Sequence, residues 1–91
     1  LYMLENVLSL SKKYPSYKTL IEGHTRPGGN SAKNLNLSQT RAQVVRDYFF
    51  ERSIPVERML TVGKGSEYPR YSDRKEKKRN DRVEIIFLYA K

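Results

Sequence analysis

The spacing of hydrophobic residues predicts alternating helices and strands along this 91-residue chain. Residues 1–13 carry apolar side chains on about half of a helical circumference, which indicates an amphipathic helix that ends before Pro15. Residues 17–22 and residues 59–63 are short apolar runs typical of strands. Residues 83–89 form two alternating sets of side chains that would point to opposite faces of a strand. This alternation is the clearest strand signal in the chain.

A second helix is predicted over residues 38–52, with Ser38 as its N-cap and Leu37 before it as part of a hydrophobic staple. At about 100° per residue, Arg41 falls in the middle of the apolar arc of this helix, so we expect it to face the core. The arc consists of Leu37, Ala42, Val44, Val45, Tyr48 and Phe49.

A guanidinium on the core-facing side of a helix is costly unless an anion meets it. The segment before this helix contains Pro27, Gly28, Gly29 and Asn30, which indicate a loop. A strand end, a loop and a helix start with an inward Arg41 together predict an anion-binding site.

The predicted order is helix, strand, helix, strand, long loop and strand. Two amphipathic helices need a sheet to cover, and three strands make a narrow one. Because the chain begins within a helix at Leu1, we expect the first strand of the domain to be missing from this chain or supplied by another. Residues 1–91 otherwise form a single domain, since nothing marks a second one.

The chain is strongly basic, with a net charge of +8. Residues 64–82 contain eight basic and four acidic residues, a pattern that suits nucleic acid, anionic lipid, an acidic wall polymer or simply a solvated loop. The absence of cysteine excludes disulfides and thiolate metal sites. No apolar run approaches the roughly 18 residues of a membrane helix, and no signal peptide is visible.

Four motifs follow one another along the chain: Gly-His-Thr at 23–25, Asn-x-x-Leu-Ser-x-x-Arg-Ala at 34–42, Gly-x-Gly at 63–65 and Asn-x-Arg-Val at 80–83. In this order and spacing the sequence resembles the OmpA-like C-terminal domain, a peptidoglycan-binding module, over about residues 4–89. The resemblance implies an α+β fold, a β-α-β-α-β-β two-layer sandwich with two helices on a mixed sheet. It also implies that the first strand is the missing one.

The resemblance further implies a pocket for the diaminopimelate side chain of the wall's stem peptide. Arg41 matches the family's carboxylate-binding arginine, and Asn34 and Leu37 match positions that shape the pocket. The family's ammonium-binding aspartate is Arg26 here, while Asp81 stands where the family has an arginine, so two charges have exchanged places. In the family, the final strand runs antiparallel beside the strand that ends in Gly-His-Thr. We therefore hypothesise that these two side chains face each other across the pocket mouth; the alternative is two unrelated changes at the surface. The candidate ligand-binding residues are Arg41, Asn34, Leu37, Arg26, Thr25, Arg82 and Asp81.

We therefore expect a non-catalytic module that anchors a membrane- or lipid-attached parent protein to peptidoglycan, in the periplasm, outer membrane or cell envelope. Ligand binding is expected to be altered or lost through Arg26. Two alternatives stay open: a structural or protein-interaction domain without peptidoglycan binding, and a basic nucleic-acid-binding domain, which no RNA-binding signature supports.

His24 has no partner at catalytic or metal-ligand spacing, so we expect a structural histidine and no enzyme, metal or cofactor. The vacant sheet edge predicts that residues 83–89 pair with a strand of another chain, either as a homo-oligomer or with another partner.

Overall fold

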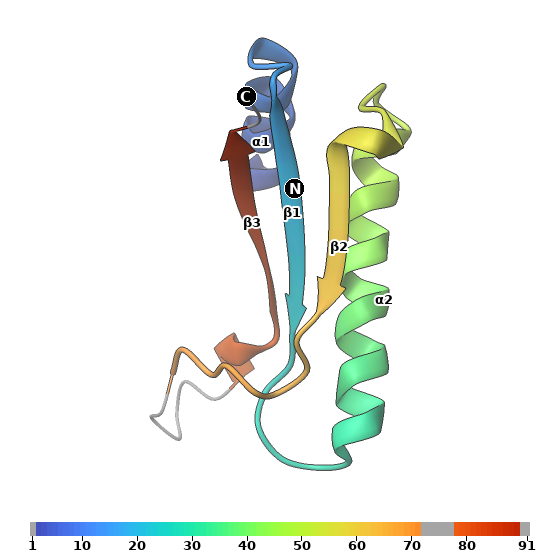
Figure 1. Ribbon diagram of the computed structural model, residues 1–91. Coiled ribbons are helices and arrows are strands. Elements are labelled where there is room, and N and C mark those ends of the chain that lie inside the picture. Colours follow the sequence, from blue (N-terminus) through green and yellow to red (C-terminus); the bar gives the residue numbers. More distant parts are fainter. Residues whose placement is uncertain (1, 72–77, 90–91) are drawn as a thin grey trace.

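The computed structural model describes residues 2–71 and 78–89 and shows two helices packed on a three-stranded mixed sheet (Figure 1). This confirms the predicted α+β class. The elements in chain order are α1 (Tyr2–Lys13), β1 (Tyr17–His24), α2 (Ser31–Phe50), the 3-10 turn η1 (Val56–Arg58), β2 (Met59–Gly63) and β3 (Arg82–Tyr89).

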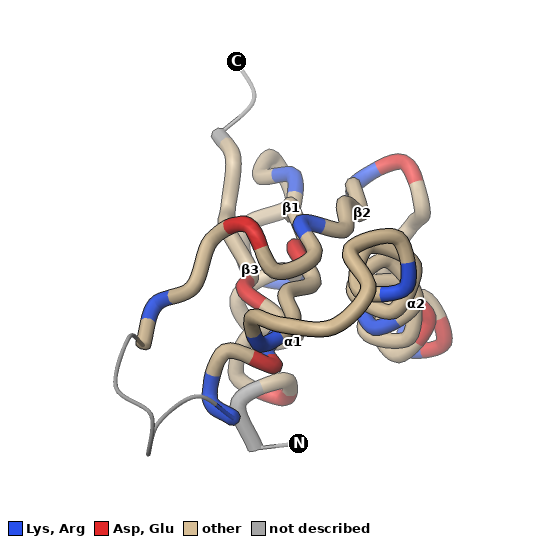
Figure 2. The backbone as a smooth tube through the Cα atoms, turned by 90° about the horizontal axis from the view of Figure 1, so that it is seen from below, with Lys and Arg blue, Asp and Glu red and all other residues tan. Residues whose placement is uncertain are grey.

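Strand β1 lies in the centre of the sheet, parallel to β2 and antiparallel to β3. Gly23 pairs with Gly63 on one side, and His24 pairs with Arg82 on the other. The ends of β1 and β2 and the start of β3 therefore meet at one end of the domain, together with the β1–α2 loop (Figure 1). Seen from this end, basic and acidic positions lie close together around β1 and β3 (Figure 2).

Within the described residues, β2 and β3 form the two edges of the sheet. The outer edge of β3 has no strand beside it in this part of the chain, and the expected partner strand stays a prediction. Neither described helix is both long and apolar enough to cross a membrane.

The core lies between the helices and one face of the sheet. Side chains from both helices and all three strands contribute to it, because alternate strand residues point to the same face. The buried hydrophobic residues are Ile21, Ala42, Phe49, Ile54 and Met59, and Leu4, Val7, Leu8, Val45, Tyr48, Val83 and Ile85 pack against them.

Helix α2 approaches β1 closely at Gly23. A Cβ at this position would overlap the backbone carbonyl oxygen of Ser38, so only glycine permits this contact. Ser38 also links α2 to the loop after β2, because its Oγ donates to the Leu35 carbonyl at 2.8 Å and accepts from the Gly65 N–H at 2.9 Å.

The predicted start of the second helix at Ser38 is wrong. Helix α2 begins at Ser31, and Asn30 is its N-cap, since the Asn30 Oδ1 accepts a hydrogen bond from the Lys33 N–H at 3.1 Å. The extra two turns were missed because residues 31–36 are mostly exposed and polar, and so lack a hydrophobic period. The helix ends at Phe50, slightly before the predicted residue 52, and β1 continues past the predicted residue 22 to His24.

The predicted core-facing arc of α2 is confirmed only in part. Its residues Ala42, Val45, Tyr48 and Phe49 lie in the core or pack against it, but Leu37 and Val44, on the other side of the arc, are 44% and 62% exposed. The buried residues of α2 are Ser38, Ala42 and Phe49. The close contact with Gly23 rotates the helix so that its small residues face the sheet, and Arg41 lies at the border between core and solvent.

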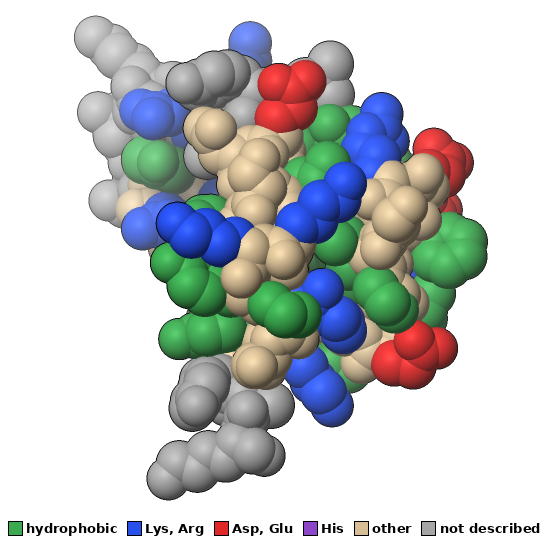
Figure 3. Space-filling view, turned by 90° about the horizontal axis from the view of Figure 1, so that it is seen from above, with side chains coloured by type: hydrophobic (Ala, Val, Ile, Leu, Met, Phe, Trp, Pro, Cys, Tyr) green, Lys and Arg blue, Asp and Glu red, His purple; other side chains and the backbone are tan. Residues whose placement is uncertain are grey.

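The opposite end of the domain is closed by Arg58. Its guanidinium Nη2 donates to the carbonyl oxygens of Ser11, Tyr14 and Tyr17 at 2.7, 3.2 and 3.1 Å, tying η1 to the turn between α1 and β1. Hydrophobic and basic side chains intermingle over the surface of this end (Figure 3).

Candidate functional site

Six of the seven predicted site residues line one open pocket of about 460 Å³ at the end of β1. The β1–α2 loop, the first turns of α2 and the residue preceding β3 contribute to its wall. The lining residues are Thr25, Arg26, Pro27, Gly28, Gly29, Asn34, Leu37, Arg41 and Asp81. Among these, the loop residues 27–29 were not predicted as ligand contacts, although their Pro-Gly-Gly sequence marked the loop.

Arg26 and Asp81 face each other across this pocket, as predicted. The Arg26 backbone N–H donates to Asp81 Oδ1 at 2.8 Å, and Arg26 Nε donates to Oδ2 at 2.7 Å. The Arg26 Nη2 also lies 2.7 Å from Oδ2. The contact follows from the strand register, because the pairing of His24 with Arg82 brings the segment just after β1 beside Asp81, which directly precedes β3.

Arg41, which lies on α2, also binds the Asp81 carboxylate. Its Nη1 lies 3.2 Å from Asp81 Oδ1 and 3.5 Å from the His24 carbonyl oxygen. Burial alone raises the pKa of Asp81, but the hydrogen bonds from Arg26 and then from Arg41 outweigh it, so this pKa is lowered. Two guanidinium groups against one carboxylate leave the pocket with one unit of positive charge.

The remaining walls of the pocket are built by its loop and by α2. Asn34 Nδ2 donates to the Gly28 carbonyl oxygen at 2.8 Å, so the predicted role of Asn34 in holding its own loop is confirmed. Leu37 supplies a half-exposed apolar side chain. Thr25 is 2% exposed, and its Oγ1 has no hydrogen-bond partner among the described residues.

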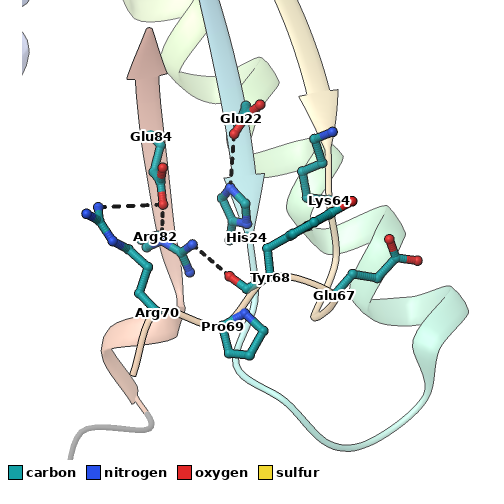
Figure 4. A pocket seen from close by; sticks show the side chains of 9 residues that line it. All are labelled: Glu22, His24, Lys64, Glu67, Tyr68, Pro69, Arg70, Arg82 and Glu84. Carbon is teal, nitrogen blue, oxygen red and sulfur yellow. Dashed lines mark hydrogen bonds and ion pairs between the residues drawn. The ribbon is translucent and has the colours of Figure 1, made fainter. Parts of the chain in front are cut away.

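Arg82 does not lie with the other predicted site residues. It follows Asp81 directly, and neighbouring strand residues point to opposite faces, so Arg82 lines a different pocket on the face of the sheet away from the helices (Figure 4). There the Arg82 Nε donates to Glu84, and its Nη2 donates to the Tyr68 carbonyl oxygen at 2.8 Å.

This second pocket contains the one group of described residues that could hold a metal ion. Glu22, His24 and Glu84 each offer a ligand atom, and these atoms lie within 4.8 Å of one another. His24 is 3% exposed and hydrogen-bonded to Glu22 at 3.3 Å, as expected of a structural histidine, and its Nδ1 has no partner among the described residues. Arg82 and Arg70 already pair with Glu84, which makes this cluster an ion-pair network of the protein itself. The sequence did not reveal this cluster, because Glu84 is distant from Glu22 and His24 in the chain and lies beside them only through the β1–β3 register.

The basic stretch at 64–82 can be followed only in part, because residues 72–77, including Arg74, Lys75 and Lys77, lie outside the described residues. Lys64 lies over the Tyr68 ring at 5.4 Å, and Arg79 lies over Tyr71 at 4.7 Å. These cations therefore have partners within the domain.

Comparison with known proteins places this architecture in one family. The family model described as the OmpA family matches residues 2–82. The chain is 41% identical over 58 residues to the peptidoglycan-associated lipoprotein of Brucella melitensis, covering 64% of this chain and 34% of that protein. It is 35% identical over 86 residues to the peptidoglycan-binding protein ArfA of Mycobacterium tuberculosis, covering 92% of this chain and 26% of that protein.

The chain thus spans about a third or less of the length of these two relatives. The crystal structure of the peptidoglycan-associated lipoprotein from Burkholderia pseudomallei superposes with a TM-score of 0.86 at 28% identity, covering 96% of this chain and 75% of that one. The predicted resemblance is confirmed, and the chain belongs to the OmpA family.

Proposed function

We propose that this domain binds peptidoglycan non-covalently and so anchors its parent protein to the wall within the cell envelope. Relatives named as peptidoglycan-associated and peptidoglycan-binding proteins support this proposal. The domain acts by binding and not by catalysis. Its binding site is the pocket that Arg26, Arg41 and Asp81 share.

The observation that carries the proposal is the Arg41 guanidinium in an open pocket. Its Nη1 group is held by Asp81 and the His24 carbonyl, which orients the guanidinium plane. Its other nitrogens make no hydrogen bond to the described residues, so they are available to a carboxylate of a wall peptide, which a guanidinium binds well.

Co-sedimentation with purified sacculi tests this function. We expect the wild-type chain to pellet with sacculi at moderate salt and Arg41→Ala to lose at least tenfold in affinity, about 1.4 kcal/mol. Arg46→Ala is the matched control, because it removes the same charge from the same helix, and among the described residues the Arg46 guanidinium forms hydrogen bonds and an ion pair only with its neighbour Asp47. Failure of the wild-type chain to pellet would contradict the proposal.

One observation favours a second candidate, a structural or protein-interaction domain that has lost the wall ligand. Asp81 already pairs with Arg41 and so takes part of the charge that a ligand would use. In that case the Arg41→Ala substitution changes the free energy of unfolding, while neither it nor the wild-type chain binds sacculi.

A further inference from the structure

The Asp81 carboxylate is already engaged by two arginines of the protein. An ionised carboxylate has about four lone-pair positions. Its Oδ1 accepts from the Arg26 backbone N–H and from Arg41 Nη1, and its Oδ2 accepts from Arg26 Nε and lies 2.7 Å from Arg26 Nη2. Three hydrogen bonds from two residues of the protein therefore occupy most of these positions, and the ion pair with Arg26 Nη2 adds a further contact to Oδ2.

The pocket consequently presents hydrogen-bond donors and no free acid. Asp81 is the only carboxylate among the described residues that line the pocket. The remaining nitrogens of Arg41 and the buried Thr25 hydroxyl are unpartnered among the described residues, and both residues line the pocket. A ligand ammonium entering here meets an excess of positive charge and a carboxylate that two arginines already neutralise, a combination that costs free energy.

We infer that this pocket selects a carboxylate without recognising a neighbouring ammonium, and that Asp81 is an internal competitor for that carboxylate. The inference rests on the proposed function and specifies its ligand. The recognised group is a free carboxylate on the stem peptide. Asp81 holds the two guanidinium groups in place while no ligand is bound, and it lowers the affinity for any incoming anion.

Three matched stem peptides test the ligand chemistry in the wild-type chain by isothermal titration calorimetry. The first carries an unmodified diaminopimelate, the second has the side-chain amine acetylated, and the third has the side-chain carboxylate amidated. We expect the first two to bind within about twofold of each other, and the third to bind at least tenfold more weakly. A tenfold loss on acetylation would overturn the inference, because it would show that the site recognises the ammonium.

The substitution Asp81→Asn tests the competition. It keeps the shape of the side chain and removes its charge, so we expect the acetylated peptide to bind about five- to tenfold more tightly than to wild type. Asp47→Asn is the control, since Asp47 is an exposed carboxylate of α2 that pairs only with Arg46 in the described residues. Weaker binding to Asp81→Asn than to wild type would overturn the inference, because Asp81 would then support ligand binding and not compete with it.

Failure of the proposed function and failure of this inference give different results. If the wild-type chain binds neither sacculi nor peptide, while Asp81→Asn binds the acetylated peptide, the proposed function is wrong and the inferred competition stands. If Asp81→Asn binds no carboxylate peptide either, the inference is wrong as well. Circular dichroism of each variant shows whether it is folded, and the three-peptide comparison in the wild-type chain decides ligand chemistry without any substitution.

Discussion

Arg26 and Asp81 lie 55 positions apart in the chain and form a two-pronged ion pair, with Arg26 Nε and Nη2 each 2.7 Å from Asp81 Oδ2. These residues carry the charges that the family motif places the other way round. The exchange keeps an ion pair at the pocket mouth. The arginine now lies on the β1–α2 loop, and the acid lies directly before β3.

Restoring the family's charges gives the first prediction. We expect Arg26→Asp alone to destabilise the domain by about 1 kcal/mol, because it places a second carboxylate against Asp81. The double reversal Arg26→Asp with Asp81→Arg should recover most of that loss and should bind the unmodified diaminopimelate peptide more tightly than wild type. Urea unfolding and calorimetry measure the two effects. A double variant as unstable as the single variant would show that the two positions do not interact.

The stability of the domain should depend on pH through Asp81 and Glu84. Burial raises both pKa values, but the arginine contacts outweigh it, through Arg26 and Arg41 at Asp81 and Arg82 at Glu84, so both are lowered. A lowered folded-state pKa stabilises the domain above the ordinary carboxyl range and loses this effect as pH falls through the lowered value. We expect a constant Tm from pH 7 to about 5 and a fall below about pH 4.

Asp81→Asn should flatten that acid-side fall, because it removes one of the two groups that must be protonated. The matched control, Asp47→Asn, should leave the slope of Tm against pH as in wild type. An unchanged slope in Asp81→Asn would mean that its ion pairs do not contribute to folding.

Ser38→Ala should destabilise the domain by about 1–3 kcal/mol, since it leaves the buried Gly65 N–H without its acceptor. The higher helix propensity of alanine offsets at most about 0.5 kcal/mol of this. Chemical denaturation provides the measurement, and Ser31→Ala, at the exposed start of α2, is the control, expected within about 0.5 kcal/mol of wild type. Equal effects at both positions would contradict the role assigned to Ser38.

Arg58→Ala should cost about 1.5–3 kcal/mol, because the guanidinium donates to three carbonyl oxygens of the α1–β1 turn. Arg58→Lys should recover little of the loss, since one ammonium does not reproduce the planar fork. Amide hydrogen exchange of residues 11–17 should accelerate in both variants. Unchanged exchange there would show that Arg58 does not hold this turn.

Much of the fold could be predicted from the sequence because it depends on short-range patterns. The period of apolar residues in α1, the alternation in β3 and the Pro-Gly-Gly loop each involve residues only a few positions apart. The order and spacing of the motifs also identified the family and brought Arg26, Arg41 and Asp81 into one hypothesis. The Arg26–Asp81 contact could be predicted only because the family's strand order was implied by the resemblance.

The start of α2 and the side that it turns to the sheet could not be predicted from local pattern. Asn30 and Ser38 are both good caps, and the exposed turns between them carry no hydrophobic period. Tertiary contact decides between them, because the close approach at Gly23 and the bond from the Gly65 N–H require Ser38 inside the helix.

The same holds for the binding site. Its chemistry depends on which atoms of Asp81 the two arginines occupy, and on the alternation that sends Arg82 to the other face of the sheet. The sequence alone determined which charges are present and, through the motifs, which segments of the fold carry them. Only the tertiary structure decided that Asp81 is held by both Arg26 and Arg41, because hydrogen bonds between residues far apart in the chain depend on strand register and side-chain geometry.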